Sequence, residues 1–177
     1  MKLKRWAKND KSLDEVQKLL SMEGLSGTAL TSHKNYKYLK QYLYNRQGEE
    51  LKHMVFQDLS TFEVWKKLGL DTLSKNPTVI LKDTEKYNLY KRYVNYFDKD
   101  YSLTPSDHKL KFDGSIAEKT AKVEIWAEKR VSVEHVKEML GLRKLGLKQL
   151  ERDPDYPFYV MYLKKTGKLY RLDPTFA

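Results

Sequence analysis

The sequence contains no cysteine, and this absence excludes several kinds of site. Disulfide bonds, thiolate metal ligands and cysteine nucleophiles all need that side chain. The chain also lacks any run of about 18 apolar residues, so the sequence predicts no membrane span. No apolar stretch follows the basic start, so no secretory signal is expected in it. Glycine-rich phosphate loops, nucleophile elbows and paired catalytic carboxylates are missing as well.

Histidines are few, and they do not form a pattern typical of a metal or catalytic site. His33, His53, His108 and His135 lie in four different local settings. Only His135 has nearby carboxylates, in Glu134 and Glu138, and such spacing is more typical of a solvated helix face. We therefore expect no enzymatic activity, no catalytic or metal-binding residues and no cofactor.

The charge is strongly basic and unevenly distributed. The net charge is +10, with 33% charged and 40% hydrophobic residues, which is typical of a soluble, folded protein. Residues 1–48 hold ten basic and four acidic side chains, whereas residues 49–104 hold nine of each. Such an excess favours nucleic acid, an anionic membrane or an acidic protein as partner, although evenly spread lysines also fit a solvated surface. Few of the basic residues are arginine, so bidentate readout of bases is poorly provided for.

The strongest pattern in the sequence is an internal repeat. Residues 6–42 align with residues 126–162 over 37 positions without a gap. Nine positions are identical, where background composition gives roughly two. The identical pairs are Trp6/Trp126, Ala7/Ala127, Ser12/Ser132, Val16/Val136, Leu20/Leu140, Leu25/Leu145, Leu30/Leu150, Tyr36/Tyr156 and Tyr42/Tyr162.

A third copy lies between these two, which predicts a tandem array of three units. Met54 stands ten residues before Val64, as Trp6 stands before Val16, and three extra loop residues bring Tyr93 into the column of Tyr42. We place the units at residues 1–48, 49–104 and 105–177. The positions that align with the outer copies are Met54, Ser60, Val64, Leu68, Leu73, Leu81, Tyr87 and Tyr93.

Start and stop signals of helices recur in every copy, so we predict an all-α fold. Ser12 with Glu15 and Ser60 with Glu63 form the capping-box pattern, and Ser132 occupies the same position. Loops are expected over 24–33 and over 71–84, where Pro77 disfavours helix, and a connector over 99–115. In the first unit, helices are expected around Trp6, over 12–24 and over 34–45, with a stop at Gln47-Gly48. In the second unit, they are expected over 49–59, 60–69 and 84–98. In the third unit, they are expected around Trp126, over 132–141, and from Asp153-Pro154 to Gly167.

Large aromatic residues explain how units of about 40 residues could hold together. A buried Trp or Tyr removes about 150–250 Å² from water, worth roughly 4–6 kcal/mol before entropy is counted. We expect the repeated aromatic residues to fill cores and not to form a base-stacking platform. The predicted signature core is Trp6, Val16, Leu20, Tyr42, Met54, Val64, Leu68, Tyr93, Trp126, Val136, Leu140 and Tyr162.

This repeat resembles the WY and LWY repeats of oomycete RXLR effectors. The resemblance rests on a Trp, a capped "S-x-x-E-V-x-x-L-L" helix and a "Y-x-x-Y-x-x-Y" helix, and it covers residues 6–165. It implies three small WY-type helical bundles in tandem, with Trp6, Trp126, Tyr42, Tyr93 and Tyr162 as the signature core. No RXLR tetrapeptide or EER cluster occurs, so we expect an effector region without its leader.

The resemblance also implies a function. Members of that family are secreted virulence proteins that act inside plant cells, in the cytoplasm or nucleus, by binding host proteins and suppressing immunity. We therefore expect a host plant protein as partner, no membrane association and a monomer. A basic helical module that binds nucleic acid is the alternative, which the core-facing spacing of the tyrosines disfavours.

Overall fold

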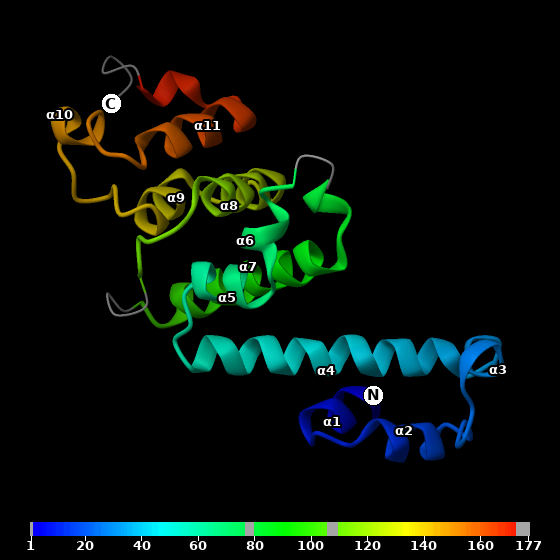
Figure 1. Ribbon diagram of the computed structural model, residues 1–177. Coiled ribbons are helices and arrows are strands. Elements are labelled where there is room, and N and C mark those ends of the chain that lie inside the picture. Colours follow the sequence, from blue (N-terminus) through cyan, green and yellow to red (C-terminus); the bar gives the residue numbers. More distant parts are fainter. Residues whose placement is uncertain (1, 77–79, 106–109, 173–177) are drawn as a thin grey trace. The chain divides into compact units, whose positions relative to one another are not determined.

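The computed structural model describes residues 2–76, 80–105 and 110–172. Every regular element in these ranges is a helix (Figure 1), so the predicted all-α fold is confirmed. The packing of the Cα trace divides the chain into two compact units, Met1–Gln57 and Asp58–Ala177. Within the described ranges, no helix is long and apolar enough to cross a membrane. Pro77 and His108 lie outside them.

The first unit consists of helices α1 (Lys2–Lys8), α2 (Leu13–Leu19), α3 (Gly27–Thr31) and α4 (Tyr36–Phe56). Helix α1 packs along α4. The core formed between the helices includes the fully buried Val16, Met22 and Tyr42. Leu25 and Leu30, from the segment expected to be a loop, pack against this core, but part of that segment folds as α3.

Helix α4 is one continuous helix of 21 residues, so the stop predicted at Gln47-Gly48 is wrong. Its first half buries Leu39 and Tyr42, and its second half buries Gly48, Leu51 and Val55. At roughly 100° per residue these two sets lie on opposite sides of the helix. Because the buried residues change from one side of the helix to the other, the apolar pattern in the sequence suggests two separate helices. The expected unit boundary after residue 48 therefore falls inside α4, whereas the division of the packing comes after Gln57.

The second unit contains the remaining helices, in the order seen in Figure 1. Helix α5 packs on α7, α7 on α8, α8 on α11, and α9 on α11. The bounds are α5 (Thr61–Lys67), α6 (Leu70–Leu73), η1 (Leu81–Asp83), α7 (Glu85–Leu103), α8 (Ile116–Lys129), α9 (Val133–Met139), α10 (Leu147–Leu150), α11 (Tyr156–Thr166) and η3 (Leu169–Leu172).

Several predicted boundaries in this unit shift. Helix α7 begins where expected but continues to Leu103, because Tyr101 extends its buried face. Short helix α6 extends into the segment expected to be a loop over 71–84, and α10 lies between the predicted helices over 132–141 and from Asp153-Pro154. Helix α11 begins at Tyr156, so Pro157 lies in its first turn and Pro154 precedes it. The predicted end at Gly167 is confirmed, since this glycine caps α11 with φ of 70°.

The loops around the three repeated serines share one backbone geometry. Ser12 and Ser60 each form the predicted capping box with Glu15 and Glu63, and the Ser132 hydroxyl accepts a bond from the His135 amide. In every copy, the residues two positions before the serine and nine positions after it have a positive φ, in the left-handed region. These are Asp10, Asp58 and Arg130 before, and Ser21, Gly69 and Gly141 after.

Candidate functional site

The structure places most of the predicted signature residues in the interior. Eight of them are buried: Val16, Tyr42, Val64, Tyr93, Trp126, Val136, Leu140 and Tyr162. The other four are half-buried: Trp6, Leu20, Met54 and Leu68. Trp65, which falls outside the signature, is fully buried and packs edge-on against Tyr90 with ring centroids 4.8 Å apart. These aromatic residues are therefore placed to hold helices together and are poorly placed to stack on a ligand.

The repeated tyrosines make the same long-range hydrogen bond in each copy. Tyr42 donates its hydroxyl to the Lys11 carbonyl, and Tyr162 donates to the Val131 carbonyl. Tyr93 donates to the Leu59 carbonyl at 2.6 Å. Each acceptor is the residue directly before the capping serine. Burial raises the pKa of all three hydroxyls, so each remains a protonated donor at neutral pH.

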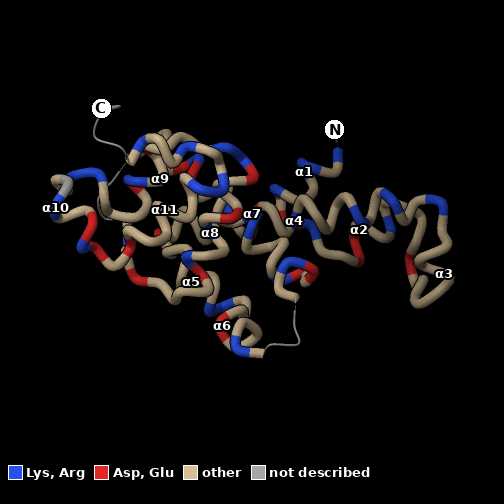
Figure 2. The backbone as a smooth tube through the Cα atoms, turned by 90° about the horizontal axis from the view of Figure 1, so that it is seen from above, with Lys and Arg blue, Asp and Glu red and all other residues tan. Residues whose placement is uncertain are grey.

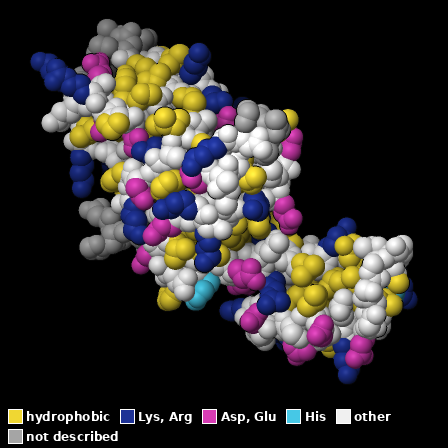
Figure 3. Space-filling view, in the orientation of Figure 1, with side chains coloured by type: hydrophobic (Ala, Val, Ile, Leu, Met, Phe, Trp, Pro, Cys, Tyr) yellow, Lys and Arg dark blue, Asp and Glu magenta, His cyan; other side chains and the backbone are white. Residues whose placement is uncertain are grey.

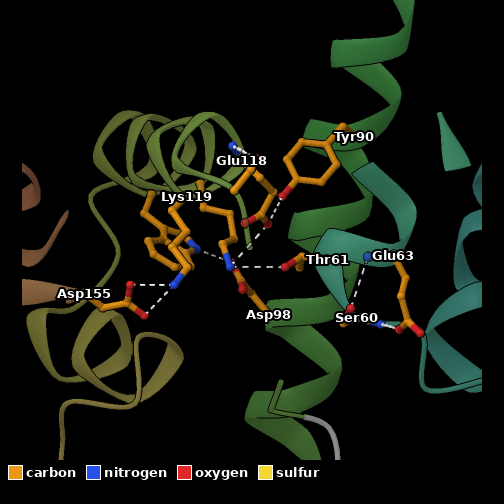
Figure 4. A network of polar contacts seen from close by, with 11 residues as sticks. Ser60, Thr61, Glu63, Tyr90, Asp98, Glu118, Lys119 and Asp155 are labelled. Carbon is orange, nitrogen blue, oxygen red and sulfur yellow. Dashed lines mark hydrogen bonds and ion pairs between the residues drawn. The ribbon is translucent and has the colours of Figure 1, made fainter. Parts of the chain in front are cut away.

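The polar side chains that converge most closely lie inside the second unit, at the centre of Figure 4. Glu118, in the first turn of α8, is fully buried. Its Oε1 accepts a hydrogen bond from the Tyr90 hydroxyl at 2.5 Å and lies 3.3 Å from Lys122 Nζ. Lys122 Nζ also donates to the Thr61 hydroxyl at 3.2 Å. A buried ion pair thus connects α8 with α5 and α7, and desolvation together with Glu118 raises the pKa of Tyr90.

Further polar contacts extend this network at its edges. Trp126 Nε1 donates to Asp98 Oδ2 at 2.9 Å, and His135 Nε2 lies 3.5 Å from the other oxygen of Asp98. Lys119 Nζ contacts both carboxylate oxygens of Asp155 at 2.5 and 2.8 Å, which ties α8 to the residue that precedes α11 (Figure 4). These polar contacts link α7, α8, α9 and the residue before α11.

The space within this network is too small for a substrate. The cavity bordered by Thr61, Asp98, Lys122 and Trp126 has a volume of about 10 Å³. Such a volume holds about one water molecule. Among the described residues, no group of three or more His, Asp or Glu side chains could hold a metal ion. The network is best explained as a polar contact that aligns α5, α7 and α8.

Basic groups on the first unit outnumber the acidic groups that could neutralise them. Arg46 contacts Asp10 and Glu50, and Lys11 contacts Glu15. By contrast, no carboxylate occurs in residues 24–48, where Lys34, Lys37 and Lys40 are exposed. Figure 2 shows basic and acidic positions interspersed along most of the second unit. In Figure 3 hydrophobic side chains appear in scattered groups on both units, among charged ones.

Comparison with known proteins identifies a relative. No family model and no solved structure matches the chain. A secreted RxLR effector protein of Phytophthora infestans is 31% identical to it over 161 residues, an alignment that covers 87% of this chain and 67% of the relative. The chain belongs to the RxLR effector family. The oomycete virulence family expected from the repeat is therefore confirmed.

The polar network of this effector was not predicted from its sequence. Glu118 and Lys122 are four residues apart on an amphipathic helix, a spacing usual for exposed ion pairs. Their neighbours Ala121, Val123 and Ile125 are apolar. Charged residues among apolar ones on this helix were the only sign in the sequence that the ion pair is buried. The partner Tyr90 is 28 residues away, so only the tertiary structure identifies the contact.

Proposed function

We propose that this RxLR effector acts inside plant cells, in the cytoplasm or nucleus, by binding a host protein and so suppressing immunity, without enzymatic activity. The similarity to a secreted RxLR effector carries this proposal. The repeat supports it, because large aromatic residues stabilise each copy from within and leave the outer side chains free to differ between copies. We further propose that the effector is a monomer that needs no cofactor and no membrane.

We also propose that the effector is a tandem array of three WY-type bundles, at residues 1–48, 49–104 and 105–177. The common geometry of the capping serines and the common tyrosine-to-carbonyl bonds support this division. In this division the boundary after residue 48 lies within α4, whose first half carries Tyr42 and whose second half carries Met54 in the tryptophan column.

The direct test is affinity capture of the tagged effector from nuclease-treated leaf extract, followed by mass spectrometry. We expect a recurrent host protein in near-stoichiometric amount. The matched control is the effector carrying Trp126→Ala, whose third bundle should unfold. Recovery of no host protein above control would contradict the proposal.

Nucleic-acid binding is the second candidate, because residues 24–48 contain four basic and no acidic residues. Titration of labelled single- and double-stranded oligonucleotides at about 150 mM salt decides between the two. A Kd of about 10⁻⁶ M or weaker would be ordinary non-specific contact. Host protein that disappears from the capture after nuclease treatment would favour nucleic acid instead.

A further inference from the structure

A second cavity of the second unit opens at the surface, next to the loop that follows α9. Its volume is about 270 Å³, and it is lined by Leu110, Phe112, Glu138, Gly141, Arg143 and Lys144. Sites for small molecules usually measure roughly 300–1,000 Å³. A cavity just below that range suits one large side chain of a partner better than a whole metabolite.

The apolar part of this cavity is built from the connector and from the left-handed turn after α9. A Cβ atom built on Gly141, whose φ is 73°, would lie 3.1 Å from the ring of Phe112. The missing side chain thus allows the ring to pack directly on the backbone. Phe112 is still 48% exposed, and Leu110 beside it is half-buried. A partially exposed aromatic ring held against a fixed turn offers a preformed apolar surface.

The rim of the cavity is basic. Two of its lining residues, Arg143 and Lys144, are basic, and the sequence contains no acidic residue between Glu138 and Glu151. The one carboxylate in the lining, Glu138, accepts hydrogen bonds from the Arg143 guanidinium and from the Tyr101 hydroxyl. The Arg143 contact holds the pKa of Glu138 below its usual range. The cavity therefore combines an apolar floor with a net positive edge.

We propose that this cavity binds a single apolar side chain of a host protein segment in which acidic residues flank that side chain. The inference rests on the proposed function and names the chemistry of the partner. Burial of a Leu-sized side chain against Phe112 and Leu110 would supply affinity, and the basic rim would select acidic neighbours. A nucleic acid fits less well, because its charge lies on a long row of phosphates, whereas only two basic residues, Arg143 and Lys144, line this small apolar cavity.

The test is a titration of the whole effector, labelled with ¹⁵N, with three capped pentapeptides. The first has the sequence Asp-Glu-Leu-Glu-Asp, the second has Ala in place of Leu, and the third has Lys in place of every acidic residue. We expect the first to shift the backbone amides of Phe112, Gly141 and Arg143. Loss of the buried side chain should weaken binding about tenfold for the second peptide. The third peptide should bind most weakly.

Variants of the effector make the result specific to the cavity. Phe112→Ala should weaken binding of the first peptide about tenfold, whereas Ile116→Ala, which removes an apolar side chain that is 79% exposed, should leave it unchanged. The double variant Arg143→Glu/Lys144→Glu should also abolish the preference for acidic peptides. The matched charge control is Lys129→Glu/Lys164→Glu, which changes two exposed lysines away from the cavity. A well-dispersed spectrum confirms that each variant is folded.

Three results would overturn the proposal: equal binding of the Leu and Ala peptides, shifts that map away from the cavity, or no shift at all. Capture from leaf extract separates this failure from failure of the proposed function. If Phe112→Ala recovers the host protein as well as the wild type does, the cavity is not the contact but host binding stands. If the wild type recovers nothing, host binding fails, and the peptide titration still decides whether the cavity has the proposed preference.

Discussion

Single hydroxyl groups join distant parts of each repeat copy in this effector. The tyrosine hydroxyl reaches the carbonyl before the capping serine across 31, 34 and 31 residues in the three copies. An unpaired buried carbonyl costs about 1–3 kcal/mol, so a buried tyrosine at this position has two roles, as core residue and as donor. This dual role explains why Tyr occupies the position in all three copies.

Removal of the hydroxyl alone should therefore destabilise the first unit. We expect Tyr42→Phe to lower the free energy of unfolding by about 0.5–1.5 kcal/mol, because the Lys11 carbonyl loses its donor. Tyr38→Phe, on the same helix but 41% exposed, is the control and should have little effect. Hydrogen exchange of amides in α1 and α4 measures both. Equal effects of the two variants would contradict the role of the bond.

The capping carboxylate Glu63 makes the second unit sensitive to acid. Bonds from the Ser60 amide and from Lys111 lower the pKa of Glu63 from 4.5 to about 2. Because the folded value lies below the unfolded one, the carboxylate stabilises the fold above about pH 4.5, and this stability is lost as the pH falls toward 2. The side chain is 40% exposed, so solvent screening limits the effect to about 1 kcal/mol or less.

Substitution of Glu63 tests this pH dependence. In urea unfolding between pH 5 and 2.5, the free energy of unfolding should fall less steeply with decreasing pH in Glu63→Gln than in the wild type. Glu15→Gln changes the matching residue of the first copy, which is more exposed and should alter the curve less. An unchanged slope in Glu63→Gln would show that other carboxylates govern the acid response.

At the scale of helices, Glu118 and Lys122 form the most deeply buried ion pair in the part of the chain that the structure describes. Both side chains are almost completely buried, and their contacts join α8 to α5 and α7. Buried pairs often add little net stability, but removal of one partner leaves an uncompensated charge. We therefore expect this pair to disfavour wrong alignments of the helices more than it favours the correct one.

A double-mutant cycle tests this interpretation. Lys122→Met should destabilise the second unit by about 3–5 kcal/mol, because Glu118 is left charged and buried. Adding Glu118→Gln should recover most of the loss, since the amide oxygen can still accept the Tyr90 hydroxyl. The free energy of unfolding in urea gives the coupling. A double variant as unstable as Lys122→Met would mean that the lysine acts through its packing against Trp126.

For the whole molecule, the two compact units imply two cores that respond separately to substitution. Trp126 is fully buried and donates a hydrogen bond to Asp98, whereas Trp6 is only half-buried. Trp126→Ala should therefore cost about 3–5 kcal/mol, and Trp6→Ala should cost less.

Residue-resolved hydrogen exchange measures how far each loss extends. In Trp126→Ala, amides of α8, α9 and α11 should lose protection, whereas amides of α1 and α2 should keep it. An unchanged melting curve in Trp126→Ala would refute the repeat, because this tryptophan would then not be part of a necessary core.

Much of the local structure could be predicted from the sequence. The Ser12 and Ser60 caps, the left-handed stops at Gly69 and Gly167 and the alignment of Tyr42, Tyr93 and Tyr162 all follow from patterns within short windows or from comparison of the copies. Family membership was also visible in the repeat. Helix ends were predicted less well, because short helices such as α3 and α10 carry no periodic signal of their own.

Only the tertiary structure decided how these elements combine. A glycine inside a helix costs about 1 kcal/mol, which suggests a stop at Gly48, but burial of Leu39 and Tyr42 on one side of α4 and of Leu51 on the other outweighs that cost. The pairing of Glu118 with Tyr90 and the cavity beside Gly141 likewise depend on residues distant in sequence. The sequence by itself determined the helices, their caps and the repeat, because these depend on neighbouring residues. Long-range packing decides three further features: the continuity of α4, the division after Gln57 and the polar network. These features involve residues far apart in sequence, so no pattern within a short window predicts them.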